Sequence, residues 1–337
     1  MPCSNITTSF VDLAASSSME AYIYGGQEAT TYMMRKTCKS TLFTQIPVPL
    51  ACRSGNAAFG GNFCVNVPRN GDYLLHLWIQ VTIPELAGGQ DTVVWTPNLM
   101  HNLVEHVCIT FNGLPAATLT SEFFDFWAAF TVPGSKQGGY DNMIGNIPAL
   151  TEGGSLGNTT PSVTLNLPVP FFFSRDTGVS LPTAAIPYNE IVVETKLRKL
   201  NELASVWTVG NPPTAWAGTE VLKDLVVWGN YAIVSNEERS RMGCAPRDIL
   251  IEQVQAVPHT TFKATESDSV VPLRFSNAVK VLFFGVKNTT YAFEHSNYTT
   301  HSRDITATFD VVPVAGAVDP VQETAVIYEN TSRIRMT

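Results

Sequence analysis

The stretch NGDYLLHLWIQVTIP, residues 70–84, decides the fold class of this 337-residue chain. Apolar side chains recur at every second position, and polar ones lie between them. The apolar set is Leu75, Leu77, Ile79, Val81 and Ile83, and the polar set is His76, Gln80 and Thr82. A period of two predicts a β-strand with one buried face. The Asn70-Gly71 pair before it is a turn signal.

The same alternation recurs along the chain. Val107, Ile109 and Phe111 are expected to point inward, and Asn112-Gly113 then predicts a two-residue hairpin turn. Further strands are expected at 163–171, 191–197, 222–235, 247–257, 278–286, 305–312 and 324–328. Charged residues make up only 15% of the chain, against about a quarter in typical domains. An all-β fold is therefore predicted.

Three short segments break the alternation and predict helices. In SEFFDFWAAF, residues 121–130, Ser121 is the expected cap, and the aromatic spacing i, i+3, i+4, i+7 predicts one buried face. That face consists of Phe123, Phe126, Trp127 and Phe130. A helical turn is expected at 19–24. The Ser235–Glu238 capping-box spacing predicts a charged linker helix at 236–248.

Two segments are predicted to lie outside the strands. Residues 1–38 are expected to form an N-terminal arm with a small apolar cluster at Phe10, Val11 and Leu13. Residues 133–161, rich in Gly, Asn and Thr, predict a long functional or surface-forming loop.

Charge argues against direct contact with nucleic acid. The formal net charge is −8, from 21 basic and 29 acidic residues, so a phosphate backbone meets net repulsion. Two basic clusters hold only three charges each and are typical of a solvated face. They are Arg35-Lys36-Lys39 and Lys196-Arg198-Lys199.

The chain lacks the sequence signals of secretion. No basic start precedes an apolar run at the N-terminus, and no window of 18 uncharged apolar residues occurs, so a soluble, unsecreted protein is expected. Six dispersed cysteines without a C-x-x-C pair favour a reducing compartment. Five N-x-S/T sequons, at Asn5, Asn158, Asn288, Asn297 and Asn330, are then expected to stay unglycosylated.

Two short motifs match catalytic signatures, but the sequence around each of them argues against a catalytic role. Asp176-Thr177-Gly178 matches aspartic proteases, but that mechanism needs two carboxylates and the chain offers no second such triplet. Turn chemistry fits better, with Arg175 and Asp176 as ion-pair partners. Ser155 stands in a G-x-S-x-G motif without the strand and helix that a nucleophile elbow requires.

No metal site is predicted either. His101 and His106, in HNLVEH with Glu105, would lie about 140° apart around a helix and could not chelate one ion. His295 and His301, near Glu294, lie in a polar loop. We therefore expect no catalytic, cofactor-binding or metal-binding residues and no cofactor.

Several long phrases, in one collinear order, resemble the major capsid proteins of large cytoplasmic DNA viruses, the iridoviruses most of all. The phrases include TLFTQIPVPL (41–50), NLMHNLVEHVCITFN (98–112), FDFWAAFTVPGSKQGGYDNMIGNI (124–147), LNLPVPFFFSRDTGVSLPTAAIPYNEI (165–191) and VVWGNYAIVSNEERSRMGCAPRDILIEQVQ (226–255).

This resemblance implies an all-β double jelly roll. It divides the chain into the arm at 1–38, a first jelly roll at 39–235, the linker helix at 236–248 and part of a second jelly roll at 249–337. It implies a structural protein, not an enzyme, that forms pseudo-hexagonal homotrimers tiling an icosahedral shell. The implied partners are copies of itself and minor capsid proteins, near an internal membrane that it does not span, in a virion assembled in the host cytoplasm.

Members of the family continue well past the equivalent of Thr337, so the resemblance implies a C-terminally truncated chain whose second jelly roll is incomplete. About fifteen inward side chains without their opposing sheet, at roughly 1.5–3 kcal/mol each, would exceed the stability of a whole domain. Trimer formation by this chain alone is thus an open question. The alternative function is a carbohydrate-binding jelly roll using the loops at 133–161 or 288–301.

Overall fold

The computed structural model describes most of the chain between Lys39 and Tyr298, with short pieces on either side. The described residues are 11, 14, 17–24, 30, 33, 39–89, 91–152, 159–186, 188–208, 212–244, 248–262, 269–298, 326–329 and 333–336. The chain divides into two units, Met1–Leu42 and Phe43–Thr337.

The described part of the first unit contains helix α2, Ser18–Tyr24. Its start is a capping box, because the backbone N–H of Ser17 donates to Glu20 Oε2 at 2.7 Å and the backbone N–H of Glu20 donates to Ser17 Oγ at 3.3 Å. The predicted helical turn at 19–24 is confirmed. Of the predicted apolar cluster, Val11 is exposed, and Phe10 and Leu13 lie outside the described residues.

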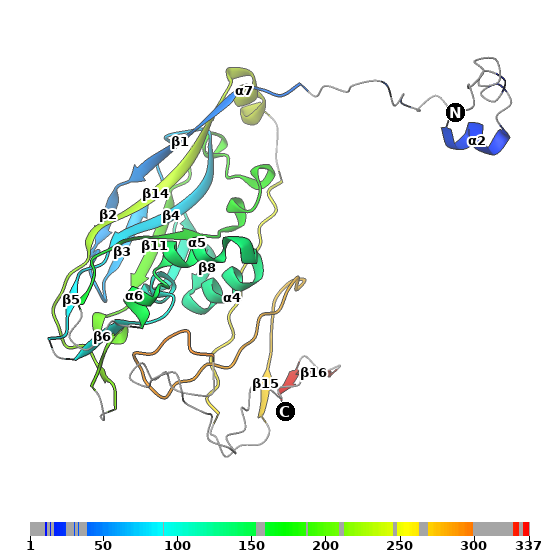
Figure 1. The fold of residues 1–337 in the computed structure, drawn as a ribbon. Coiled ribbons are helices and arrows are strands. Elements are labelled where there is room, and N and C mark those ends of the chain that lie inside the picture. Colours follow the sequence, from blue (N-terminus) through cyan, green and yellow to red (C-terminus); the bar gives the residue numbers. More distant parts are fainter. Residues whose placement is uncertain are drawn as a thin grey trace, which may run out of the picture. The chain divides into compact units, whose positions relative to one another are not determined.

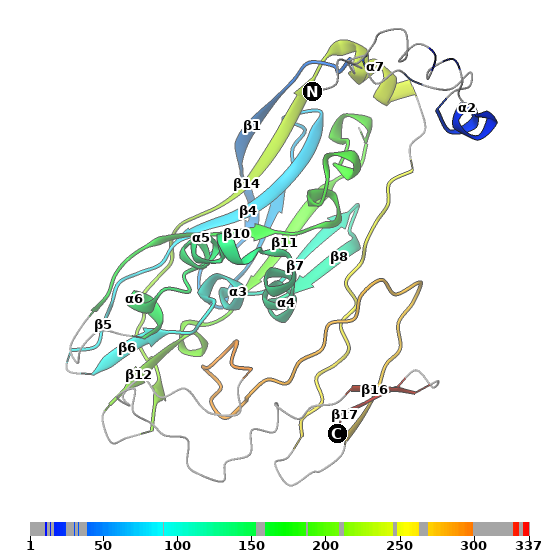
Figure 2. The same ribbon diagram turned by 45° about the vertical axis from the view of Figure 1, so that its right-hand side comes forward.

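The second unit is built on two antiparallel sheets, whose strands are labelled in Figures 1 and 2. One has the order β1 (Phe43–Leu50), β14 (Lys223–Val234), β4 (Tyr73–Thr82), β10 (Thr164–Val169). The other has the order β2 (Cys52–Gly55), β3 (Asn62–Asn66), β11 (Ile191–Leu197), β7 (Val104–Phe111), β8 (Leu114–Thr120). The chain crosses from one sheet to the other six times, which is the strand arrangement of a jelly roll. The predicted β-sheet character is confirmed.

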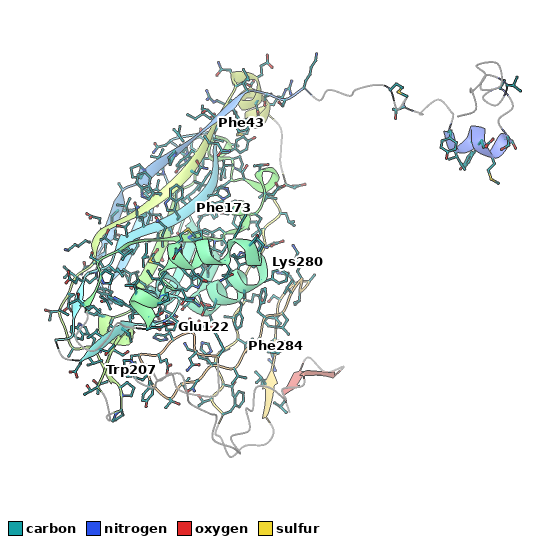
Figure 3. The ribbon with its side chains drawn as sticks, viewed as in Figure 1. Phe43, Glu122, Phe173, Trp207, Lys280 and Phe284 are labelled. Carbon is teal, nitrogen blue, oxygen red and sulfur yellow. The ribbon has the colours of Figure 1, made fainter. Side chains whose placement is uncertain are left out.

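One continuous apolar core lies between the two sheets. It takes Phe63 from β3, Ile79 from β4 and Leu165 from β10, each at most 1% exposed. Burying one such side chain stabilises the fold by about 1.5–3 kcal/mol. The apolar run after β10 belongs to the core as well, because Phe171 and Phe173 are buried with ring centroids 5.6 Å apart (Figure 3).

The strand predictions at 163–171, 191–197 and 222–235 are confirmed by β10, β11 and β14. In β4 the prediction was wrong at one residue. Leu75 is buried, but it packs with Tyr73 and Met242 on the opposite face from Leu77. The cause is an irregularity in the β14–β4 register next to Asn230, which inserts an extra residue into β4 and reverses the alternation there.

The hairpin predicted at Asn112-Gly113 is confirmed. Asn112 has φ 52° and Gly113 has φ 79°, the left-handed backbone that a two-residue turn between β7 and β8 requires. Val107 and Ile109 are fully buried as predicted, whereas Phe111 is half-buried at the end of the strand.

The predicted aromatic helix is α4, Ser121–Thr131, but two details differ. Its N-cap is Thr120, not Ser121, because the Ser121 hydroxyl is buried and donates to Asn102 Oδ1 at 3.0 Å instead. Phe130 is 65% exposed, so it does not complete the buried face. Phe124, outside the predicted face, is buried in the core.

The predicted long loop at 133–161 was wrong in its first part. It folds into α5 (Gly134–Ile144) and α6 (Pro148–Thr151), and Ile144 and Leu150 anchor these helices in the core. Gly145 ends α5 with φ 85°, a conformation that suits glycine at a helix end. Composition suggested a loop, but two buried apolar anchors are sufficient to hold two short helices.

The charged helix predicted at 236–248 from the capping box is α7, Asn236–Cys244, so its start is as predicted but it ends before residue 248. Met242 packs on the outer face of the four-stranded sheet. Asp72 lies beside it and accepts hydrogen bonds from Arg239 at 2.7 and 2.9 Å and from the Val234 backbone N–H at 2.9 Å. This contact fixes α7 to the end of the sandwich.

Two strands expected after α7 do not form within the described residues. Residues 248–257 and 278–286 belong to no strand, since an alternating sequence needs a paired strand before it becomes part of a sheet. The strand expected at 305–312 lies outside the described residues. Part of the strand expected at 324–328 is present as β16 (Val326–Glu329). It pairs with β17 (Arg333–Met336), and β17 also pairs with β15 (Ser269–Pro272).

Small elements close the ends of the sandwich. Two further minor sheets pair β5 (Leu86–Ala87) with β9 (Thr159–Thr160), and β12 (Ala204–Trp207) with both β6 (Thr92–Trp95) and β13 (Thr214–Ala215). The remaining helices are α3 (Leu99–Leu103), η1 (Phe172–Ser174), η2 (Thr177–Val179), η3 (Thr183–Ala185) and η4 (Leu200–Glu202). Among the residues that the structure describes, no helix has the length and apolar character needed to cross a bilayer.

Prolines mark the edges of both main sheets. The edge strand β1 holds Pro47 and Pro49, the edge strand β10 holds Pro168, and the edge strand β8 holds Pro115. Proline has no backbone N–H to donate, so it is tolerated at an edge and excluded from central strands.

Candidate functional site

A buried polar cluster joins the sandwich to the segment at 294–298. Its centre is Asp125 on α4, which is 8% exposed. One carboxylate oxygen, Oδ1, accepts from Asn98 Nδ2 at 3.0 Å and from His101 Nδ1 at 2.7 Å. The other, Oδ2, accepts from the hydroxyls of Ser296 at 2.5 Å and Tyr298 at 2.7 Å. Residues more than 170 positions apart therefore meet on one carboxylate. We call these residues, with Tyr140, the Asp125 cluster.

Hydrogen bonds keep the Asp125 carboxyl ionised. Burial alone raises the pKa of Asp125, but hydrogen bonds from His101, Ser296 and Tyr298 outweigh burial and hold that pKa below the usual value of a carboxyl. Burial raises the pKa of Tyr298, so its hydroxyl keeps its proton and remains a donor. Asp125 is thus an ionised acceptor satisfied by four donors.

His101 extends the cluster to α5. Its Nδ1 donates to Asp125, and its Nε2 lies 2.8 Å from the Tyr140 hydroxyl. Burial raises the pKa of Tyr140, so the phenol donates to Nε2. A catalytic triad places a serine or cysteine nucleophile at that nitrogen. Here the nitrogen is taken by a protonated phenol, and the histidine is 1% exposed, so the chain Asp125–His101–Tyr140 ties three helices together.

A second layer of hydrogen bonds supports the same junction. Asn102 donates to Ser296 Oγ at 2.7 Å and accepts from Ser121 Oγ at 3.0 Å. Arg198 donates to the Asn102 carbonyl at 2.7 Å and to Ser121 Oγ at 2.9 Å. The Thr96 hydroxyl accepts from the His295 backbone N–H at 3.1 Å. The basic cluster predicted as a solvated face therefore has Arg198 turned into an internal network.

His295 is the buried end of this layer. Burial, together with the positive charges of Arg198 and Lys287, lowers the pKa of His295 to about 3. Its Nδ1 lies 3.2 Å from Lys287 Nζ, and its Nε2 is buried with no hydrogen-bond partner. Lys287 Nζ also lies 3.7 Å from a Glu122 carboxylate oxygen. An imidazole in this setting stays neutral.

Aromatic packing forms the apolar part of the junction. The Phe283 ring stacks on Phe126 with centroids 6.1 Å apart, and it meets Phe123 and Phe130 edge to face. Gly285 leaves room for this contact, because a Cβ there would lie 2.8 Å from Phe126 Cζ. The outer face of α4 is therefore a docking surface for residues 283–298.

Arg175 and Asp176 do not pair with each other, so the predicted ion pair was wrong. The Arg175 guanidinium lies 4.1 Å from the centroid of the Trp127 ring and 2.6 Å from a Glu252 carboxylate oxygen. Asp176 caps its own turn, accepting from the Thr177 backbone N–H at 2.8 Å. Arg175 has better partners because α4 and the segment after α7 both reach it.

The other residues weighed as candidates are dispersed. His101 lies on α3 and His106 on β7, so they do not share a helix, and Glu105 pairs with Lys196 at 2.7 Å. Within the described residues no group of three or more His, Cys, Asp or Glu could hold a metal ion. Ser155 and His301 lie outside the described residues.

Two sequons can be placed. Asn297 is 8% exposed, and its side chain donates to Glu294 Oε1 at 3.1 Å. Asn288 accepts from the Thr290 backbone N–H at 3.0 Å in a local turn. Asn5, Asn158 and Asn330 lie outside the described residues. In the folded chain the buried Asn297 is closed to modification, and the absence of glycans elsewhere stays a prediction.

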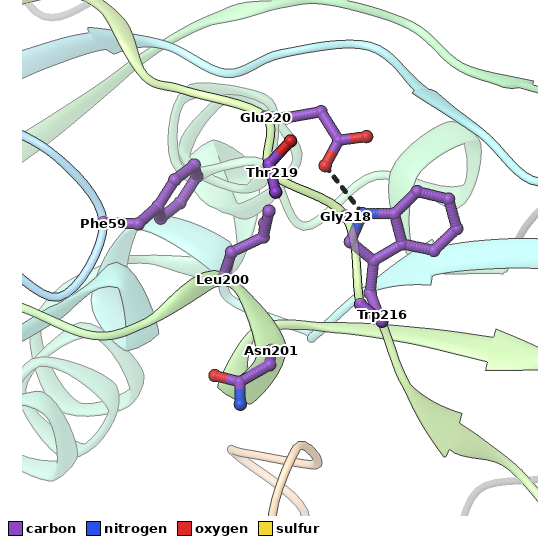
Figure 4. A pocket seen from close by; sticks show the side chains of 8 residues that line it. Phe59, Leu200, Asn201, Trp216, Gly218, Thr219 and Glu220 are labelled. Carbon is purple, nitrogen blue, oxygen red and sulfur yellow. Dashed lines mark hydrogen bonds between the residues drawn. The ribbon is translucent and has the colours of Figure 1, made fainter.

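A shallow cavity of about 410 Å³ lies at the end of the sandwich near η4 (Figure 4). Phe59, Leu200 and Trp216 form its apolar side. The Trp216 indole donates to Glu220 Oε2 at 2.8 Å and closes the loop over Gly218, where a Cβ would lie 2.1 Å from that oxygen. The tryptophan and the carboxylate are therefore used in shaping the loop.

One feature of the sequence points to the Asp125 cluster. Asp125 is a single acid between Phe124 and Phe126 in an otherwise apolar helix. A charged residue at such a place is buried only when it is paired. Its partners Ser296 and Tyr298 could not be identified, because nothing in sequence spacing connects them with α4.

Comparisons with known proteins agree over nearly the whole chain. Residues 31–233 match the family "Major capsid protein N-terminus", and residues 238–337 match "Large eukaryotic DNA virus major capsid protein". The major capsid protein of Simulium iridescent virus is 49% identical over 99% of this chain and 75% of its own length. That of Frog virus 3 is 39% identical over 98% of this chain and 76% of its own length.

Among solved structures, the PBCV-1 virus capsid chain shares the fold, with a TM-score of 0.57 at 21% identity. The match covers 73% of this chain and 56% of that chain. The resemblance inferred from the sequence phrases is confirmed by these relatives. The chain belongs to the family of major capsid proteins of large eukaryotic DNA viruses.

Proposed function

We propose that this chain is a structural subunit of a virus capsid that associates with copies of itself. The observation that carries the proposal is the 49% identity, along 99% of the chain, to a protein described as a major capsid protein. The strand order of the sandwich and its likeness to a solved capsid chain support the same role. The action of the protein is then to present complementary surfaces, not to transform a substrate.

We further propose the double jelly roll as the architecture. The first roll covers 39–235, the linker helix 236–248, and residues 249–337 belong to a second roll, with 1–38 as an arm. The boundary between the two family matches falls between residues 233 and 238, at the start of α7, which supports this division. The Asp125 cluster would then fix the first roll against the start of the second.

The assembly proposed is a pseudo-hexagonal homotrimer that tiles an icosahedral shell. Its partners are other copies, neighbouring trimers and minor capsid proteins. The shell lies near an internal membrane that the chain does not span, and the virion is assembled in the host cytoplasm. A net charge of −8 supports a place away from the genome, because a phosphate backbone would be repelled.

Carbohydrate binding, the alternative function, has less support. One of the loops considered for it contains α5 and α6, whose buried side chains anchor them to the core. In the other, the side chains of Ser296 and Tyr298 are taken by Asp125. A glycan array probed with the purified chain tests this alternative, and the expected result is no binding above background.

Sedimentation of the purified 337-residue chain tests the self-association. We expect a concentration-dependent species of three times 36.7 kDa. Electron microscopy of that species is expected to show threefold particles with a hexagonal base. A chain that stays monomeric at every accessible concentration would overturn the proposal.

A further inference from the structure

The outer face of the four-stranded sheet carries an aromatic row across all four strands. The strand register places Pro49, Trp228, Trp78 and Pro168 side by side, on β1, β14, β4 and β10. The two indoles stack with centroids 6.0 Å apart and an interplanar angle of 5°. Both tryptophans are half-buried and both prolines are exposed. The row is thus a rigid apolar ridge at the surface of the second unit.

The outward residues around this row include no Asp, Glu or Arg, and one Lys, Lys223, which pairs with Thr82 at the margin of the face. Its outward residues, which together we call the tryptophan face, are Gln45, Pro47, Pro49, His76, Trp78, Gln80, Thr82, Thr164, Asn166, Pro168, Val226, Trp228 and Asn230. Partial burial lowers the pKa of His76, so this side chain is neutral at neutral pH. The nearest charged residues of these strands, Lys223 and Asp224, lie at the irregular start of β14.

The outer face of the five-stranded sheet is different. Glu194 lies exposed at its centre, and Lys196 pairs there with Glu105. Arg53 pairs with Glu190 nearby. The two outer faces of one sandwich thus differ in charge, so the absence of carboxylates from the tryptophan face is a property of that face and not of the whole protein.

Polar side chains on the tryptophan face bond to one another. The Trp228 indole donates to Gln80 Oε1 at 2.9 Å, the Thr82 and Thr164 hydroxyls are 3.0 Å apart, and Asn230 donates to Gln45 at 3.2 Å. Groups already satisfied within the face cost less to dehydrate when another surface covers it. Aromatic residues without charge are also typical of the centre of a protein interface.

We propose that the tryptophan face is the centre of a contact with a second copy of this chain, an inference that rests on the proposed self-association. The argument for a copy is electrostatic. Two chains of net charge −8 repel each other over most of their surfaces, and they approach at lowest cost where a face has no carboxylate and almost no other charge. A basic partner would be drawn to carboxylates, and this face has none.

The dimensions of the face fit the centre of an interface. Four strands about 4.8 Å apart, with seven residues of about 3.3 Å each along β4, give roughly 300 Å² in projection. A stable interface needs about 800 Å² from each partner. The proposed interface therefore extends beyond the tryptophan face. The row of tryptophans and prolines forms its centre, from which water is fully excluded.

The test places single charges on the exposed ends of the ridge and measures self-association of the whole chain. Pro49→Glu and Pro168→Glu are chosen because both prolines are exposed, so the core is untouched. Thr118→Glu is the matched control, since Thr118 lies on the outer face of the five-stranded sheet opposite Cys108. Trp228→Glu is a second, more severe variant. Circular dichroism and the melting temperature report folding for each.

The expected result is that Pro49→Glu and Pro168→Glu raise the dissociation constant about tenfold or more, because a charge buried at an interface centre is left unpaired. Thr118→Glu should leave the dissociation constant within about twofold.

If the natural chain associates and both proline variants associate equally well, the inference is overturned while the proposed function stands. If the natural chain never associates, the proposed function itself fails. Quenching of indole fluorescence by oligosaccharides without self-association would assign the face to glycans and overturn the inference.

Discussion

The His101 imidazole donates through Nδ1 to the Asp125 carboxylate over 2.7 Å, and neither residue is more than 8% exposed. This pair connects α3 with α4. Through Tyr140, Ser296 and Tyr298 it also connects α5 and the segment that follows the sandwich. A buried carboxylate is costly unless its hydrogen-bonding capacity is satisfied, and here the donors come from α3 and from the segment that contains Ser296 and Tyr298.

Removal of the central carboxylate is expected to loosen this junction. Asp125→Ala should lower the free energy of unfolding by about 3–5 kcal/mol, because it leaves buried donors without an acceptor. Chemical denaturation followed by tryptophan fluorescence measures the change. Asp176→Ala is the control within the same chain, because Asp176 only caps its own exposed turn and should cost about 1 kcal/mol or less. Equal losses in the two variants would contradict the role given to the Asp125 cluster.

A side chain at Gly285 should displace the segment at 283–298 from α4. The first atom of Gly285→Val would lie 2.8 Å from Phe126 Cζ, so either the ring or the segment must move. We expect faster hydrogen exchange and earlier proteolytic cleavage around 283–298, with the sandwich core unchanged. Gly138→Ala in α5 meets no atom within 4 Å and should stabilise the chain by about 0.5–1 kcal/mol. Unchanged exchange at 283–298 in Gly285→Val would exclude the docking described.

The Asp72–Arg239 contact predicts a pH dependence. The hydrogen bond from Arg239 is the main reason that the pKa of Asp72 lies below its usual value. A lowered pKa in the folded state stabilises the fold above the unfolded pKa, near 4, and this stabilisation is lost as pH falls through the folded pKa. Asp72→Asn and Arg239→Gln should each remove the same part of the stability difference between pH 7 and pH 3.

The double variant distinguishes a direct pair from two independent effects. If the two residues act through each other, Asp72→Asn with Arg239→Gln should lose little more than either change alone. Urea unfolding at pH 7, 5 and 3 gives the three free energies for each protein. Strict additivity would mean that the contact does not set the pKa of Asp72.

The β7–β8 turn should depend on its backbone angles. Gly113 has φ 79° with open space around it, so Gly113→Ala adds strain but no clash, and about 1 kcal/mol should be lost. Asn112→Ala should cost at least as much, since the Asn112 amide also accepts from the Glu190 backbone N–H at 2.8 Å. Thermal unfolding measures both. An unchanged melting temperature in Gly113→Ala would argue against the left-handed turn.

The sequence predicted those parts of the fold that depend on local pattern. β10 and β11 appear where the alternation of apolar residues placed them, because one face of each strand is buried along its whole length. The position of Leu75 could not be predicted, because the extra residue in β4 is set by its pairing with β14, about 150 positions later. The helices at 134–151 were missed because only Ile144 and Leu150 hold them, and the surrounding composition is that of a loop.

The members of the candidate site could not be predicted from the sequence. The sequence around each catalytic motif argued against a catalytic role. For Asp176 it indicated a turn, and the structure places Asp176 in a turn. The Asp125 cluster could not be predicted because its members lie on α3, α4, α5 and the segment at 294–298. Only the folded chain brings these together, and no spacing rule connects residues 24 and 173 positions apart.

The prolines of the edge strands have a consequence for a protein made in many copies. Open edges with free N–H groups would let sandwiches join strand to strand into endless fibrils, and crowding during shell construction would favour that reaction. Pro47 and Pro49 on β1, Pro168 on β10 and Pro115 on β8 interrupt those edges. Under the proposed self-association, copies would then meet through the faces of their sheets and not through their strand edges.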